Sequence, residues 1–97
     1  MLVLGFDWDQ RNRRRLELHD LDPESVEDLF EDGDPFVFRH PTARRRWVAL
    51  GFVPDGRFVL VVFEHDVDTK WVRVVTAYEP SGSRWWKAYA KAKGIRS

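Results

Sequence analysis

The longest uninterrupted run of apolar side chains lies near the middle of the chain, at residues 58–63. Six β-branched or aromatic residues in a row are too few to span a membrane, and they leave no polar face for solvent. The run therefore predicts a strand that is buried on both faces, in the middle of a sheet. A turn signal at residues 54–57 joins it to an antiparallel partner at residues 46–53, and residues 71–78 return as a third strand.

Shorter patterns on either side of this meander predict two more strands and two helices. Apolar residues 2–6 predict a first strand at an edge, and residues 36–39 predict another strand. Asp9 can cap a helix over residues 10–18. Asp22 and Pro23 start a second helix, whose buried stripe is expected to be Val26, Leu29 and Phe30.

A last helix is predicted over residues 84–93, capped by Ser83 and ended by Gly94. Its apolar face is expected to hold Trp85, Ala88, Tyr89 and Ala92. The predicted architecture is one α+β domain over residues 1–97. It has a mainly antiparallel sheet, two N-terminal helices and one C-terminal helix, with the helices on one side of the sheet.

Composition narrows the class of protein. The chain has 97 residues, enough for one modest core, and its five Trp and seven Phe are expected to dominate that core. With no Cys and only three scattered His, neither a disulfide, a metal site nor a cofactor is predicted. The first six residues are too short for a signal peptide, so a cytoplasmic location without membrane attachment is expected.

Charge is segregated along the chain although the formal net charge is 0. Arginines cluster at residues 11–15 and 44–46, the tail after residue 83 is basic, and the acids concentrate between residues 20 and 34. Such a dipolar surface can attract a polyanion, and each run is equally consistent with a solvated helix or loop face.

The N-terminal third combines Trp8-Asp9, an Asn four residues after the Trp, His19 seven residues after that Asn, and an acidic helix. This pattern resembles the BrnT-type toxins, and weaker similarity continues at residues 50–51, 55–57 and 73–77. The resemblance implies a RelE-like fold and a ribonuclease toxin of a type II toxin–antitoxin pair, which cuts RNA without metal and inhibits translation. It further implies a cognate antitoxin, expected to be of the ribbon-helix-helix type. The complex would contact operator DNA only through that antitoxin.

Three positions depart from the family pattern. Tyr78 stands where the family usually has Arg, Trp85 where it usually has Glu, and Asp20 where Gly is common. A Tyr cannot replace the bidentate donor that an Arg offers to a phosphate. The departures favour an alternative, a catalytically weakened relative that binds RNA or a partner protein without cutting. A further alternative is a structural protein whose arginines pair with a partner's acidic tail.

Four residues are candidates for catalysis: His19, Arg73, Tyr78 and Glu79. Metal-free cleavage needs a base for the ribose 2′-hydroxyl, an acid for the leaving oxygen and cations for the phosphorane charge. Imidazole exchanges a proton near neutral pH, so His19 suits acid–base work. Structural alternatives are a His19 that caps the first helix, an Arg73 at an exposed edge or paired with Glu64, and loop-anchoring roles for Tyr78 and Glu79.

The candidates for RNA binding are Arg11, Arg44, Arg46 and Trp86. Alternation along a strand predicts that Arg44 and Arg46 point together and that Arg45 points oppositely. Trp86 lies off the apolar stripe of the last helix and is therefore expected to be free to stack on a base. The nuclease hypothesis requires that Arg44, Arg46, Arg73 and His19 share one concave basic surface.

Overall fold

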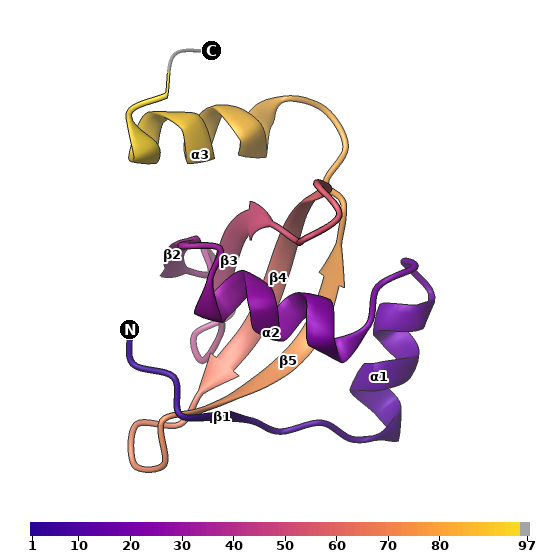
Figure 1. The fold of residues 1–97 in the computed structure, drawn as a ribbon. Helices are drawn as coiled ribbons and strands as arrows, with labels where there is room; N and C mark the ends of the chain where they lie inside the picture. Colours follow the sequence, from indigo (N-terminus) through magenta and orange to yellow (C-terminus); the bar gives the residue numbers. More distant parts are fainter. Residues whose placement is uncertain (96–97) are drawn as a thin grey trace.

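The computed structural model describes residues 1–95 and shows an α+β arrangement of five strands and three helices (Figure 1). The helices are α1 (Gln10–Glu17), α2 (Pro23–Glu31) and α3 (Arg84–Lys93). The strands are β1 (Gly5–Phe6), β2 (Phe36–Arg39), β3 (Trp47–Phe52), β4 (Phe58–His65) and β5 (Trp71–Tyr78). The predicted class, element order and most boundaries are confirmed. The first strand is the exception, because it is much shorter than residues 2–6.

The sheet has the order β1-β5-β4-β3-β2, so β4 lies at its centre as predicted. Pairing is antiparallel from β2 through β5, whereas the edge strand β1 pairs parallel with β5, which makes the sheet mixed. Residues 59–63 of β4 are at most 8% exposed. The continuous apolar run is thus explained by burial on both faces.

A β-bulge interrupts the pairing of β4 with β5. Val62 lies opposite Thr76 and Phe63 lies opposite Val74, so Val75 is an extra residue on β5. Val72 and Val74 before the bulge and Ala77 after it all face the same core cluster.

Helices cover both faces of the sheet, which corrects the expectation that they share one side. One core cluster joins residues of α1 and α2, including Leu16 and Leu29, to one face. The other cluster joins Tyr89 of α3 to Leu50 and Leu60 on the opposite face. Because β3 and β4 present apolar side chains to both sides, one layer of helices would leave half of that surface in water. Figure 1 shows α2 in front of the sheet and α3 above it.

The buried face of α3 also differs from the prediction. Tyr89 and Ala90 are buried and Ala92 is exposed. The ring of Trp86 packs against Phe58, with the ring centroids 5.5 Å apart, and against Tyr89 at 5.8 Å. Trp85, Ala88 and Tyr89 of the predicted face do pack against this cluster. Trp86 joins them in place of Ala92, so the helix is rotated slightly from the expected phase. Within residues 1–95 no helix is long and apolar enough to cross a membrane.

Candidate nucleic-acid interface

Helix α1 lies along the open edge of β5. Because β1 pairs only with Trp71 and Val72, the outer edge of β5 has no strand beside it after residue 72. Asn12 Nδ2 donates to the carbonyl of Val74 at 3.1 Å, and Arg15 Nη1 donates to that of Val75 at 3.5 Å. The helix therefore satisfies part of the strand edge and runs beside it from Arg73 towards Tyr78.

Asn12 is only 2% exposed and uses its whole side chain in this arrangement. Its Oδ1 accepts from the backbone N–H of Asp9 at 2.8 Å, while its own N–H donates to Asp9 Oδ1 at 2.9 Å, which forms a capping box. Its Nδ2 donates to the carbonyl of Asp7 at 2.9 Å as well as to Val74. Nearby, Trp8 Nε1 donates to Glu27 Oε2 at 2.7 Å and links this segment to α2. Trp8, Asp9 and Asn12, the other residues of the N-terminal sequence pattern, thus hold α1 in place against β5 and α2.

His19 and Tyr78 meet at the C-terminal end of α1. Their ring centroids are 5.8 Å apart, and His19 is exposed. Within residues 1–95 its imidazole makes no hydrogen bond to the helix carbonyls, so no side-chain capping role is observed. Arg11 and Arg15 are four residues apart and therefore share one flank of α1, and His19 lies in the turn that follows the helix. These residues form a basic stripe that leads along the edge of β5 to the His19–Tyr78 pair.

Glu79 does not join this pair. Its Oε2 lies 3.9 Å from Nη1 of Arg57, whose Nε is bound by Asp55 at 2.9 Å. In the described part of the chain the Glu79 carboxylate makes no hydrogen bond or ion pair with His19 or Tyr78.

Arg73 is held by two carboxylates at the other end of α1. Its Nη2 donates to Asp9 Oδ2 at 2.5 Å, and its Nη1 donates to Asp7 Oδ2 at 3.4 Å. Glu64 lies directly opposite Arg73 on β4, yet the predicted pair between them is not among the ion pairs of residues 1–95. Hydrogen bonding to Asp9 raises the pKa of Arg73. Two acids therefore neutralise the only arginine among the four catalytic candidates.

Asp9 should make the stability of the fold sensitive to acid. The backbone N–H of Asn12 and then Arg73 lower the pKa of this carboxyl below its ordinary 3.8. A depressed pKa stabilises the fold above the unfolded value, and the contribution is lost as pH falls through the folded value. The midpoint of thermal unfolding should consequently fall more steeply below about pH 4 in the wild type than in Asp9→Ser, which keeps an uncharged cap. Parallel slopes in circular-dichroism melts of the two proteins would contradict this role.

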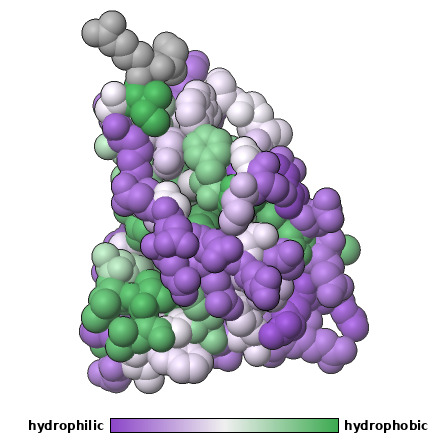
Figure 2. Space-filling view, in the orientation of Figure 1, coloured by the Kyte–Doolittle hydropathy of each residue, from purple (hydrophilic) through white to green (hydrophobic). Residues whose placement is uncertain are grey.

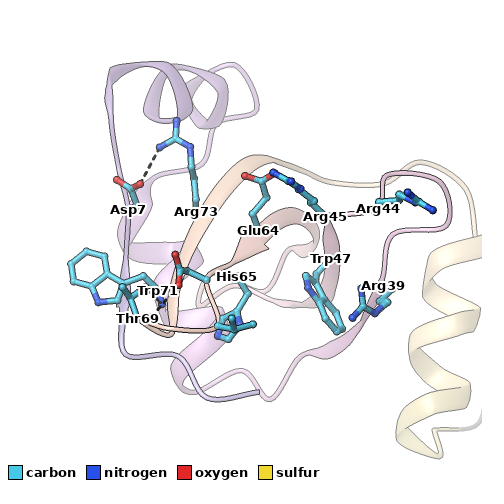
Figure 3. Close-up of a pocket in the computed structure, with 12 residues that line it drawn as sticks. Asp7, Arg39, Arg44, Arg45, Trp47, Glu64, His65, Thr69, Trp71 and Arg73 are labelled. Carbon is cyan, nitrogen blue, oxygen red and sulfur yellow. Dashed lines mark hydrogen bonds and ion pairs between the residues drawn. The ribbon is translucent and has the colours of Figure 1, made fainter.

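An open cleft of about 740 Å³ lies at the end of the sheet where β4 turns into β5 (Figure 3). Four arginines line it together with the acids Asp7, Glu64 and Asp66 and two tryptophans, Trp47 and Trp71. The arginines are Arg39, Arg44, Arg45 and Arg73. Arg39 stacks on Trp47, 4.6 Å from the ring centroid, and Trp71 is 48% exposed. The cleft combines cations with an accessible aromatic surface.

Arg44 and Arg45 lie in a turn, because the N–H of Arg46 donates to the carbonyl of Ala43 at 3.0 Å and β3 starts only at Trp47. Strand alternation therefore does not apply, and Arg44 and Arg45 both line the cleft while Arg46 does not. Within residues 1–95 neither of the two lining arginines has an acidic partner within 4 Å. Both are exposed and available to an anion.

The structure brings only part of the predicted site together. The four residues expected on one concave surface, Arg44, Arg46, Arg73 and His19, do not share it, because only Arg44 and Arg73 line the cleft. His19 contacts Tyr78, and Arg44 and Arg73 line the same cleft at opposite ends (Figure 3). Arg11 lies on α1. Arg46 and Glu79 lie apart, and Trp86 is engaged by other aromatic rings. Sequence reasoning did not single out Arg15 and Trp71 as site residues, and it expected Arg45 to point away from Arg44. The spacing of four to His19 and of two to Arg73 could have indicated Arg15 and Trp71.

No protein-family profile and no curated protein sequence matches this chain. The chemistry of the site is therefore argued from its geometry. Within residues 1–95 no group of three or more His, Asp or Glu side chains could hold a metal ion. The arrangement offers an exposed imidazole beside a phenol, a basic stripe, and a cleft with arginine and tryptophan.

Proposed function

We propose that the protein binds single-stranded RNA and cleaves it without a metal ion at the His19–Tyr78 pair, as a RelE-like toxin of the BrnT type. The observation that carries the proposal is the meeting of these two rings, 5.8 Å apart, with the His19 imidazole exposed. The similarity of residues 6–30 to the toxin pattern supports the same class. The proposal includes a cytoplasmic location and a ribbon-helix-helix antitoxin that alone contacts operator DNA.

The basic stripe on α1 gives the RNA a path between the cleft and the His19–Tyr78 pair. Arg73 and Tyr78 are five residues apart on β5, which corresponds to about 17 Å along a strand. At about 3.4 Å per stacked nucleotide, this distance spans roughly five nucleotides. The phosphates would follow Arg44, Arg45 and Arg11 towards Arg15, and a base would stack on the exposed face of Trp71.

At the pair itself, His19 accepts the proton of a ribose 2′-hydroxyl, and the 2′-oxygen attacks the adjacent phosphorus. The bond from phosphorus to the 5′-oxygen of the next nucleotide breaks, and that oxygen takes a proton from the Tyr78 hydroxyl. Arg15, four residues before His19, is the cation assigned to the charge that develops on the phosphorane. The products are a 2′,3′-cyclic phosphate and a 5′-hydroxyl, and solvent restores both protonation states.

Incubation of the purified protein with a labelled single-stranded RNA of about twelve nucleotides, in EDTA, tests the proposal. Fragments that end in a 2′,3′-cyclic phosphate are expected. The same oligonucleotide with 2′-O-methyl groups should bind but remain intact, because it lacks the attacking hydroxyl. An RNA that stays intact at enzyme excess over many hours would refute the cleavage proposal.

A second candidate function is RNA binding without cleavage. The pairing of Arg73 with Asp7 and Asp9 favours it, because the charge of the one arginine among the catalytic candidates is then neutralised. Under this alternative the unmodified and the methylated RNA bind equally well and neither is cut.

Both functions require the cleft to hold phosphates. Arg45→Ala should weaken RNA binding and reduce the slope of log Kd against log salt by about 0.7, the value for one phosphate contact on a single strand. Arg13→Ala is the matched control, because Arg13 is exposed on the opposite flank of α1. Fluorescence anisotropy at several salt concentrations measures both. Equal slopes for the two variants would exclude the cleft from the RNA path.

A further inference from the structure

The N-terminal segment forms an edge of the sheet with one side open. The N–H of Leu4 donates to the carbonyl of Lys70 and that of Asp7 to Val72, each at 2.8 Å, so the segment follows β5 beyond the two residues of β1. His65 Nε2 donates to the carbonyl of Leu2 at 2.8 Å and fixes its start. On the other side no strand pairs with β1 within residues 1–95. An edge with free peptide groups can accept another strand.

A groove of about 290 Å³ runs beside this open edge. Residues 3–6 form one wall, and Glu27 and Glu31 of α2 form the other. Helix α2 carries four acids and no base in its nine residues, namely Glu24, Glu27, Asp28 and Glu31. Glu27 is ordered by its bond from Trp8, whereas Glu31 is exposed and makes no ion pair in the described residues. The groove is therefore narrow and negative.

Apolar side chains surround the same edge. Met1, Leu2 and Leu4 are 55%, 61% and 65% exposed, and Val67 in the neighbouring β4–β5 turn is 70% exposed. Figure 2 shows an apolar area at the lower left, where Figure 1 draws the N-terminal segment, bordered by hydrophilic surface. Exposed leucines concentrated at a free strand edge indicate an interaction surface.

We propose that this edge binds an extended peptide of a partner protein that alternates basic and apolar residues. The peptide adds a strand beside β1, because the main chain there offers unpaired donors and acceptors. Side chains alternate across a strand, so its Lys or Arg residues enter the groove towards Glu27 and Glu31 while its apolar residues cover Leu2 and Leu4. Each charged end meets a carboxylate, and each aliphatic stem lies against Val3 or Phe6.

The negative charge of the groove disfavours two other ligands, a second copy of the chain and RNA. A second copy of the chain, paired edge to edge, would bring two acidic grooves together, and RNA would place phosphates against Glu27 and Glu31. The proposed surface is lined by none of the residues assigned to RNA, so it does not depend on the function proposed above.

Titration of the full chain with the capped peptide Ser-Lys-Val-Arg-Val-Lys-Ser, followed by amide chemical shifts in NMR, tests the proposal. Saturable shifts are expected at residues 2–7 and 27–31. Glu31→Lys should weaken binding by about tenfold or more, because it reverses the charge that faces the basic side chains. Glu24→Lys, the same change on the same helix outside the groove, should leave the affinity within about twofold.

Two further peptides separate strand addition from simple charge attraction. The acidic version Ser-Glu-Val-Glu-Val-Glu-Ser should not bind, and N-methylation of both valines should abolish binding by removing N–H donors. Four results would overturn the proposal. They are shifts confined to another surface, equal losses in the two lysine variants, undiminished binding of the methylated peptide, and self-association of the wild type through residues 2–7.

Discussion

Replacing His19 with alanine is expected to lower the rate of RNA cleavage by about 10²–10⁴-fold, the usual contribution of a positioned acid or base. The imidazole is exposed, makes no hydrogen bond in the described residues, and lies in the turn after α1. Its removal should therefore leave the fold intact. The affinity for a methylated RNA should change by less than about threefold, because the phosphates are held by arginines elsewhere. Cleavage of a labelled oligonucleotide under single-turnover conditions measures the rate.

Two other variants give the His19 result its meaning. Tyr78→Phe keeps the ring beside His19 and removes only the hydroxyl, so it should slow cleavage without loss of stability. Arg13→Ala changes the far flank of α1 and should cleave at the wild-type rate. A His19→Ala protein that cuts at the wild-type rate would remove the pair from the mechanism, even if the chain proved to be a nuclease.

Asn12→Asp is expected to reduce the free energy of unfolding by about 3–5 kcal/mol. The aspartate has the same shape but no N–H, so the carbonyls of Asp7 and Val74 would face carboxylate oxygens instead of donors. A charge without a partner in a site that is 2% exposed adds its own penalty. A domain of this size is stable by only about 5–15 kcal/mol, so the loss would be a large fraction of the total.

Urea denaturation measures this loss, and Gln10→Glu is the matched control. It makes the same change from amide to acid on an exposed residue in the first turn of α1, where it should alter stability by less than about 0.5 kcal/mol. Similar midpoints for Asn12→Asp and the wild type would show that the edge of β5 does not need the Asn12 donors.

Local signals along the chain were sufficient for the class of fold and for most elements. The apolar run of β4, the Asp-Pro start of α2 and the glycine after α3 each depend on nearby residues, and each was predicted correctly. Contacts between distant segments were not predictable in this way. The parallel pairing of β1, the covering of the second face by α3, and the rotation that buries Trp86 all depend on which surfaces meet.

The site was less predictable because its side chains contact residues that are distant in the sequence. An ion pair of Arg73 with Glu64 was one alternative from the meander, and the two residues do lie opposite each other, yet Arg73 binds Asp7 and Asp9 from the other edge. The alternation expected for Arg44 to Arg46 failed because these residues close a turn before β3 begins. The contact of His19 with Tyr78 needed the position of α1 along β5, which the polar surface of that helix did not indicate.

The extra residue Val75 has a consequence for any comparison of this sequence with another. Positions 73 and 78 differ by an odd number, and in a regular strand they would project to opposite sides. The additional residue reverses that parity, because Arg73 pairs with Glu64 and Tyr78 with Leu60, two even-numbered neighbours on one face of β4. An alignment that gains or loses one position between residues 73 and 78 would therefore assign the following residues to the wrong face of the sheet, however similar the two sequences were.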